Sequence, residues 1–164
     1  KEIITALIIT ALIRTMIGLV PAILLTSPLF GVSILKLGLP LLLLFLSLYI
    51  FGITLGLFVS AGLIRFGPSF ENIAWSSLFL LAPLGCIYYP IEILPNFFQI
   101  IAKGLPLVYI FDETRNILLN GFVNYENLKQ AYLLNFLYLV IGVNLFYFSY
   151  LKARITGTLI NMGE

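Results

Sequence analysis

The densest group of ionisable side chains is Asp112, Glu113 and Arg115, three charges within four consecutive positions. Asp112 and Glu113 are the only clustered carboxylates that a membrane-embedded lipid-modifying enzyme could use for acid–base chemistry. Asp112 and Arg115 are three positions apart, so a helix would let them pair locally. A gate in a transport pathway is the functional alternative, and we favour a structural pair or a solvated face.

Two further groups could contact a transported molecule. Arg65 and Glu71 flank a short polar break and could attract an anionic substrate or position a partner, although topological anchoring is the favoured interpretation. Tyr89, with Tyr88 and Tyr109, could stack on sugars leaving a pathway. Aromatic residues at membrane interfaces are common as anchors alone, and we favour that role.

Residues typical of catalytic centres are otherwise scarce. The chain has no histidine, and its lone cysteine, Cys86, lies within an apolar run where it is expected to fill space. No phosphate loop of the form G-x-x-x-x-G-K-[ST] is present. We therefore expect no catalytic residue, cofactor or metal site in this chain. Asn135 and Asn144 are expected to form hydrogen bonds between helices, with pathway lining as the alternative.

The elements that must position these residues follow from composition. Hydrophobic residues make up 61% of the chain and charged residues only 10%, against about 25% charged in soluble domains. A helix rises about 1.5 Å per residue, so about 20 residues cross a bilayer core of about 30 Å. A charge at mid-membrane costs at least about 2.5 kcal/mol. Four uncharged runs reach this length and predict membrane spans: 15–35, 37–64, 72–91 and 130–151.

The predicted fold is an all-α membrane protein forming one transmembrane domain over residues 1–164, with about four spans. Either an interfacial helix ends near Arg14 before the first span, or the span begins early and leaves at Ser27-Pro28. The second span begins near Pro40 and ends near Leu63. Its small residues Gly52, Gly56 and Ser60 favour packing within the chain. The third and last spans are expected at 73–88 and 131–151.

The segment 89–120 contains several prolines and glycines between apolar stretches that are too short to span. It predicts a re-entrant or interfacial pair of short helices before the last span, followed by a turn at Asn120-Gly121. Arg65, Lys152 and Arg154 lie directly at span ends. By the positive-inside rule we expect a multi-pass protein of the plasma (inner) membrane with both ends of the chain in the cytoplasm. The net charge of +2 is too small to indicate nucleic-acid binding.

An ordered series of residues between two predicted spans resembles the ABC type-2 exporter permeases. The series is Arg65-Phe66-Gly67, Pro83-Leu84-Gly85, Tyr89-Pro90, Leu94-Pro95, Leu105-Pro106-Leu107 and Arg115. The resemblance covers most of the chain, although the first 35 residues match only in hydrophobicity. It implies six spans per subunit, of which this chain would hold the third to sixth. Earlier spans and most or all of the helix that couples to the ATPase would lie before Lys1.

The resemblance also implies the function and partners. Such a permease has no catalytic centre and forms the pathway for a lipid-linked polysaccharide, lipid or drug, while a separate ABC ATPase subunit binds the ATP. Two permease copies, or two homologues, enclose the pathway within membrane lipid. The alternatives are a membrane-embedded lipid-modifying enzyme and a non-catalytic membrane scaffold.

Overall fold

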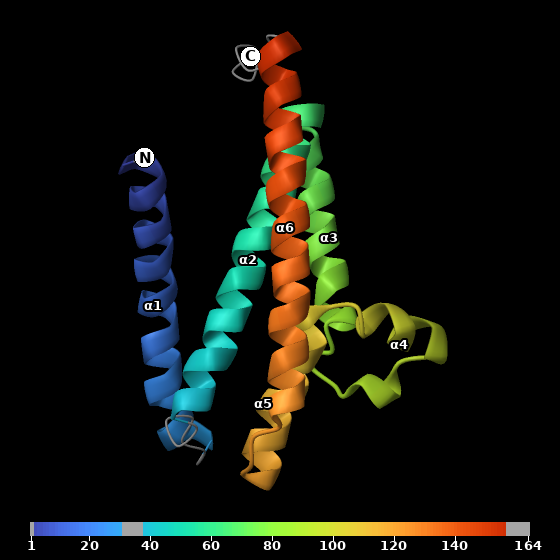
Figure 1. Ribbon diagram of the computed structural model, residues 1–164. Helices are drawn as coiled ribbons and strands as arrows, with labels where there is room; N and C mark the ends of the chain where they lie inside the picture. The colour runs from blue at the N-terminus through green and yellow to red at the C-terminus, as the bar shows by residue number, and fades with distance from the viewer. Residues whose placement is uncertain (1, 31–37, 157–164) are drawn as a thin grey trace. The chain divides into compact units, whose positions relative to one another are not determined.

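The computed structural model describes residues 2–30 and 38–156, and its regular elements in these residues are all helices. Two compact units are present, Lys1–Leu41 and Leu42–Glu164. The helices, shown in Figure 1, are α1 (Glu2–Phe30), α2 (Leu39–Phe66), α3 (Phe70–Leu84), η2 (Ile91–Ile93), α4 (Asn96–Ala102), α5 (Pro106–Asn120) and α6 (Tyr125–Thr156). The predicted all-α class is confirmed.

Helix α1 is continuous past both places where the sequence suggested a break. It passes Arg14 without interruption, and it runs through Pro21 and Pro28 to Phe30. The hydroxyls of Thr10 and Thr15 donate to the carbonyls of the residues four positions earlier, as in an unbroken helix. Neither the interfacial helix ending near Arg14 nor the exit at Ser27-Pro28 is therefore present.

Helix α2 contains the predicted Pro40 in its first turn, where the missing N–H is harmless. Gly67 ends it in the left-handed conformation at φ 76°, and its N–H donates to the carbonyl of Leu63 at 2.8 Å. A Cβ at Gly62 would lie 2.1 Å from the ring of Phe70, so only glycine lets α3 fold back so closely. Within Leu42–Glu164 nothing lies within 4 Å of a Cβ at Gly52 or Gly56, so this unit does not supply the packing expected for that face.

Helix α3 is shorter than the predicted third span and ends at Leu84 instead of Tyr88. Gly85 closes it by donating to the carbonyl of Leu81 at 2.7 Å, and Cys86 follows with a strained φ of 52°. Ser69 is the N-cap residue of α3, but its hydroxyl accepts no capping hydrogen bond from the backbone. Fifteen residues rise only about 22 Å. Among the described residues, two helices are long and apolar enough to cross a membrane, α2 and α6.

The predicted short helices between α3 and α6 are present. Pro95 and Pro106 lie at the starts of α4 and α5, which explains why 89–120 breaks into pieces. A small apolar core of Cys86, Ala102 and Val108 joins the pieces. Gly121 ends α5 at φ 75° and donates to the carbonyl of Ile117 at 3.0 Å, which confirms the predicted turn.

Helices α2 and α6 run in the same direction. Tyr132 donates to the carbonyl of Leu43 at 2.7 Å, and one turn later Asn135 bonds Ser47. Because residue numbers increase in the same direction along both helices from one contact to the next, α2 and α6 are parallel. Figure 1 shows α3 running in the opposite direction. The interhelical role expected for Asn135 is confirmed. Asn144 instead donates to Val140 in its own helix, so the same expectation is wrong there.

Candidate functional site

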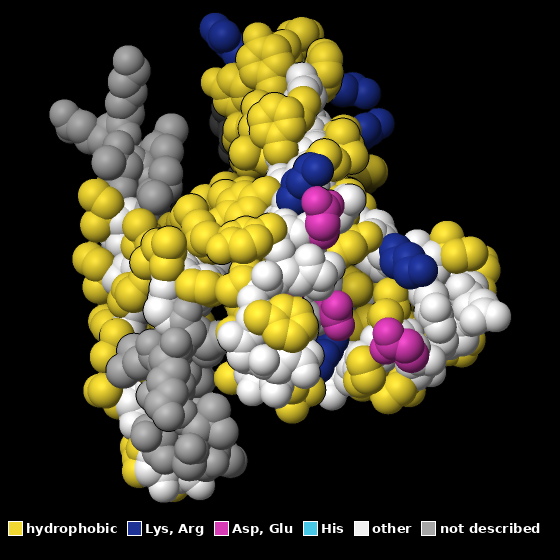
Figure 2. Space-filling view, turned by 60° about the horizontal axis from the view of Figure 1, so that its bottom comes forward, with side chains coloured by type: hydrophobic (Ala, Val, Ile, Leu, Met, Phe, Trp, Pro, Cys, Tyr) yellow, Lys and Arg dark blue, Asp and Glu magenta, His cyan; other side chains and the backbone are white. Residues whose placement is uncertain are grey.

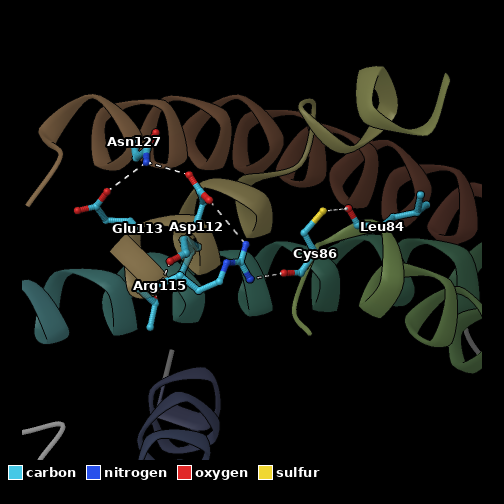
Figure 3. Close-up of polar contacts among 8 residues, drawn as sticks. Leu84, Cys86, Asp112, Glu113, Arg115 and Asn127 are labelled. Atoms are coloured by element: carbon cyan, nitrogen blue, oxygen red, sulfur yellow. Dashed lines mark hydrogen bonds and ion pairs between the residues drawn. The ribbon is translucent and has the colours of Figure 1, made fainter. Parts of the chain in front are cut away.

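The predicted charged residues of α5 meet the first turn of α6 in what we name the α5–α6 polar cluster, formed by Asp112, Glu113, Arg115, Asn124 and Asn127. The amide of Asn127 donates to Glu113 at 3.1 Å and to Asp112 at 3.3 Å. Figure 3 shows both bonds converging on Asn127 from neighbouring residues of α5. One side chain of α6 thus forms hydrogen bonds with two neighbouring carboxylates of α5.

Glu113 is fully buried, which is rare for a carboxyl group. Its Oε1 accepts the backbone N–H of Asn124 at 2.7 Å, and its Oε2 accepts the amide of Asn127. Among the described residues it forms no ion pair, so these hydrogen bonds are what offset its loss of hydration. Glu113 therefore fastens the start of α6 to α5.

Arg115 connects α5 to the segment that follows α3. Its Nη1 donates to the carbonyl of Cys86 at 2.8 Å, across 29 positions of sequence. Its Nη2 lies 3.8 Å from the carboxylate of Asp112, which confirms the predicted local pair. This Nη2 is buried and has no hydrogen-bond partner among the described residues. Figure 3 shows Arg115 lying between Asp112 and Cys86.

Cys86 lies just beyond the end of α3, outside the two membrane-length helices, and is fully buried. The thiol is therefore inaccessible, as expected for a space-filling cysteine and not for a nucleophile.

An open hollow of about 600 Å³ lies beside the α5–α6 polar cluster. Asp112, Arg115 and Asn127 contribute to its lining, together with Asn116 and Asn120 from the same face of α5. It offers hydrogen-bond donors and acceptors to a polar molecule. Both carboxylates already accept internal bonds, so the geometry suits binding or gating better than acid–base catalysis. No group of three metal-ligating side chains occurs in the residues that were placed.

Arg65 and Glu71 are not brought together. The Arg65 guanidinium lies 5.5 Å from the ring centroid of Phe66 in the last turn of α2. Glu71 lies in the first turn of α3 and accepts the indole N–H of Trp75 at 3.5 Å. Neither forms an ion pair with a described residue. They mark the α2–α3 turn and do not belong to the α5–α6 polar cluster.

The tyrosines of the broken segment divide into two kinds. Tyr89 donates its hydroxyl to the carbonyl of Pro83 at 2.8 Å, and Tyr109 donates to Lys103 at 3.0 Å. Both bonds satisfy carbonyls where the chain bends, which gives these side chains a structural role. Tyr88 is 82% exposed, so it is the one whose ring is free to meet lipid or sugar.

Several contributors were not singled out from the sequence. Asn124 and Asn127 look like ordinary turn and helix-start residues, and Tyr138 looks like another apolar span residue. Tyr138 donates to the carbonyl of Gly104 at 3.0 Å, which ties α6 to the end of α4. The sequence did carry one signal for Asn124 and Asn127. They follow closely after the turn at Gly121, and a turn there brings the chain back toward α5.

No protein-family model, no curated protein and no solved structure matches the chain. Its function must therefore be argued from the arrangement of its own residues.

Proposed function

We propose that this chain is a membrane-embedded permease subunit of an ABC exporter. The first support is its surface. Only 22% and 17% of the residues in the most apolar stretches of α2 and α6 are buried inside the protein. Figure 2 shows hydrophobic side chains over much of the visible face, with charged side chains scattered between them. Continuous exposed apolar surface of this extent is stable against lipid and costly in water.

The second support is the parallel pair formed by α2 and α6. Two parallel spans begin on the same side of a membrane, so the chain between them must cross back once. The segment available for this crossing is 67–124. Helix α3 begins it, but at 15 residues it covers only about 22 Å, so the break and α5 complete the crossing. With α1 as a further span, the chain has four crossings and both ends lie on one side.

The orientation proposed is cytoplasmic for both ends, in the plasma (inner) membrane. Arg65 at the end of α2 and Lys152 near the end of α6 line one common groove, so these basic residues share one end of the helix pair. Positive residues are retained on the cytoplasmic side of spans. The α5–α6 polar cluster then lies toward the outer face.

The observation that carries the transport proposal is the helix break between α3 and α5. Irregular backbone at membrane depth is tolerated where it lies within protein or beside a water-filled cavity, and transporters use broken helices to line their pathways. The proline series that resembles the ABC type-2 permeases falls on the same break. In this proposal Tyr89 and Arg115 hold the break in shape, while Asp112 and Glu113 hold α5 to α6 as an outward gate.

The transport step needs partners that this chain does not contain. A separate ABC ATPase subunit binds and hydrolyses the ATP, and a second permease copy or homologue completes the pathway for a lipid-linked polysaccharide, lipid or drug. The lipid-modifying enzyme is less well supported, because Asp112 and Glu113 are engaged in internal hydrogen bonds. A non-catalytic scaffold would require no such break between its spans.

The test is co-purification in detergent with an ATPase encoded beside the gene. We expect a stable complex and an ATPase rate that changes when the permease is reconstituted in vesicles with candidate substrates. Disrupting the break with Pro106→Ala should uncouple ATPase stimulation while the complex still forms. Absence of any association would refute the exporter proposal, and association without nucleotide-dependent transport would favour the scaffold.

A further inference from the structure

A groove between the C-terminal ends of α2 and α6 combines positive charge with an apolar floor. We name it the α2–α6 basic groove, and its volume is about 490 Å³. Arg65 and Phe66 line it from α2, and Leu145, Phe148, Ser149 and Lys152 are among the residues that line it from α6. The two cations come from different helices, so the groove depends on the parallel packing that sets those helices side by side.

Charges and apolar side chains are separated along the groove. Leu145 and Phe148 lie deeper along α6, and Lys152 lies nearer the helix end, seven positions and about 10 Å beyond Leu145. Phe66 adds a second aromatic ring beside Arg65. This order matches an amphiphile whose apolar tail lies beside the span and whose charged head lies at the membrane surface.

The cations of the groove are available for a ligand. Within residues 2–30 and 38–156, the ion pairs are Asp112–Arg115 and Glu126–Lys129, so Arg65 and Lys152 have no described carboxylate partner. Among the described residues, none that lines the groove is acidic. Arginine and lysine are the side chains that bind phosphate, arginine through its planar fork and lysine as a compact charge.

We propose that the α2–α6 basic groove binds the phosphate of an anionic phospholipid from the surrounding leaflet. Arg65 and Lys152 contact the phosphate, Ser149 is placed to donate to its ester oxygens, and the acyl chains lie over Leu145 and Phe148. Basic pockets between helix ends on the cytoplasmic side recognise anionic headgroups in this way. The bound lipid would bridge α2 and α6 where the protein itself supplies no salt bridge between described residues. This inference rests on the membrane embedding proposed above, and it does not depend on transport.

The experiment compares lipid retention by the detergent-purified protein, measured by native mass spectrometry with phosphatidylglycerol and with phosphatidylcholine. We expect retention of phosphatidylglycerol to exceed that of phosphatidylcholine by roughly tenfold or more. The double variant R65Q/K152Q should abolish the difference. The matched control is R154Q, which removes a basic residue from the same end of α6 that does not line the groove. R65K/K152R preserves charge and should retain selectivity, which guards against loss of folding.

Each outcome bears on the proposal. Equal loss in R154Q would overturn it in favour of a diffuse basic surface, and equal retention of both lipids in the unmodified protein would overturn it outright. If millimolar inorganic phosphate displaces the lipid, the groove is a site for a free phosphate ion, and the lipid proposal is overturned. Selective retention without any ATPase association would leave the groove standing while refuting the exporter. A protein that stays dissolved without detergent would refute both.

Discussion

Asn135 of α6 donates its side-chain amide to Ser47 of α2 twice, at 2.9 Å to the backbone oxygen and at 2.8 Å to the hydroxyl. Both residues are buried. Because both side chains are buried between two apolar helices, this polar contact fixes which turn of α6 meets which turn of α2. The α2–α6 basic groove near the C-terminal ends of the two helices depends on that register.

Replacing Asn135 with alanine should destabilise the α2–α6 pair by about 0.6–2 kcal/mol, the range measured for hydrogen bonds between membrane helices. The matched control is Asn144→Ala, because Asn144 bonds only Val140 of its own helix and is exposed. Unfolding in mixed micelles with increasing denaturing detergent measures the difference. A double-mutant cycle with Ser47→Ala should show coupling, and strict additivity of the two substitutions would contradict the assigned bond.

Glu113→Ala should destabilise the α5–α6 hairpin by about 1–3 kcal/mol, because it leaves the N–H of Asn124 and the amide of Asn127 short of an acceptor. Glu126→Ala is the control, since Glu126 is exposed and its pair with Lys129 at 3.9 Å should contribute less than about 1 kcal/mol. Amide hydrogen exchange at residues 120–130 would report the loss locally. Equal protection in the two variants would count against a fastening role for Glu113.

Gly62→Ala should be far more harmful than Gly56→Ala, although both lie in α2. The added methyl at Gly62 would enter the ring of Phe70, and overpacking of this kind costs about 1–3 kcal/mol. At Gly56 the added methyl has space and improves helix propensity, so stability within the monomer should be unchanged or slightly raised. Thermal unfolding of both purified variants checks this order. Loss of self-association in Gly56→Ala with unchanged unfolding would indicate that a second copy of this chain packs on that face.

Local residue chemistry was sufficient to predict much of this fold. Proline at Pro95 and Pro106 and glycine at Gly121 act on their own backbone, so the breaks and the last turn follow from sequence alone. The Asp112–Arg115 pair follows from helical spacing, which is also local. The Asn135 bond was predictable as a type of contact, because a buried amide in an apolar helix needs a partner, although Ser47 could not be named in advance.

The remaining features depend on how distant segments meet. Asp112 and Glu113 are adjacent carboxylates, and only the packing of α5 on α6 decides that Glu113 is the buried one. The bond from Arg115 to Cys86 joins positions 29 apart, so spacing gives no signal for it. The end of α3 at Leu84 was missed because apolar residues continue to Tyr88, whereas the backbone had already turned at Gly85.

Cys86 should react slowly with a small maleimide in the folded protein and quickly after unfolding. It is fully buried, so the reagent can reach its thiol only when the junction after α3 opens. Tyr88→Cys in a Cys86→Ala background supplies an exposed thiol two positions away and should react at the rate of a free peptide. Comparable rates for the two thiols in native protein would show that the junction after α3 opens readily.

The parallel arrangement of α2 and α6 determines which ends of these helices lie on the same side of a membrane, and a labelling experiment can test this. If both helices cross the membrane, Ser69 after α2 and Ile155 at the end of α6 lie on one side, and Asn120 before α6 lies on the other. Single cysteines at these positions, each in the Cys86→Ala background, should respond to a membrane-impermeant reagent accordingly. In cells with an intact inner membrane, Asn120→Cys should be labelled, whereas Ser69→Cys and Ile155→Cys should be labelled only in inverted vesicles. Labelling of Ser69→Cys and Asn120→Cys from the same side would remove the return crossing, because α3 and α5 would then lie on the membrane surface and α2 and α6 could not both be parallel spans.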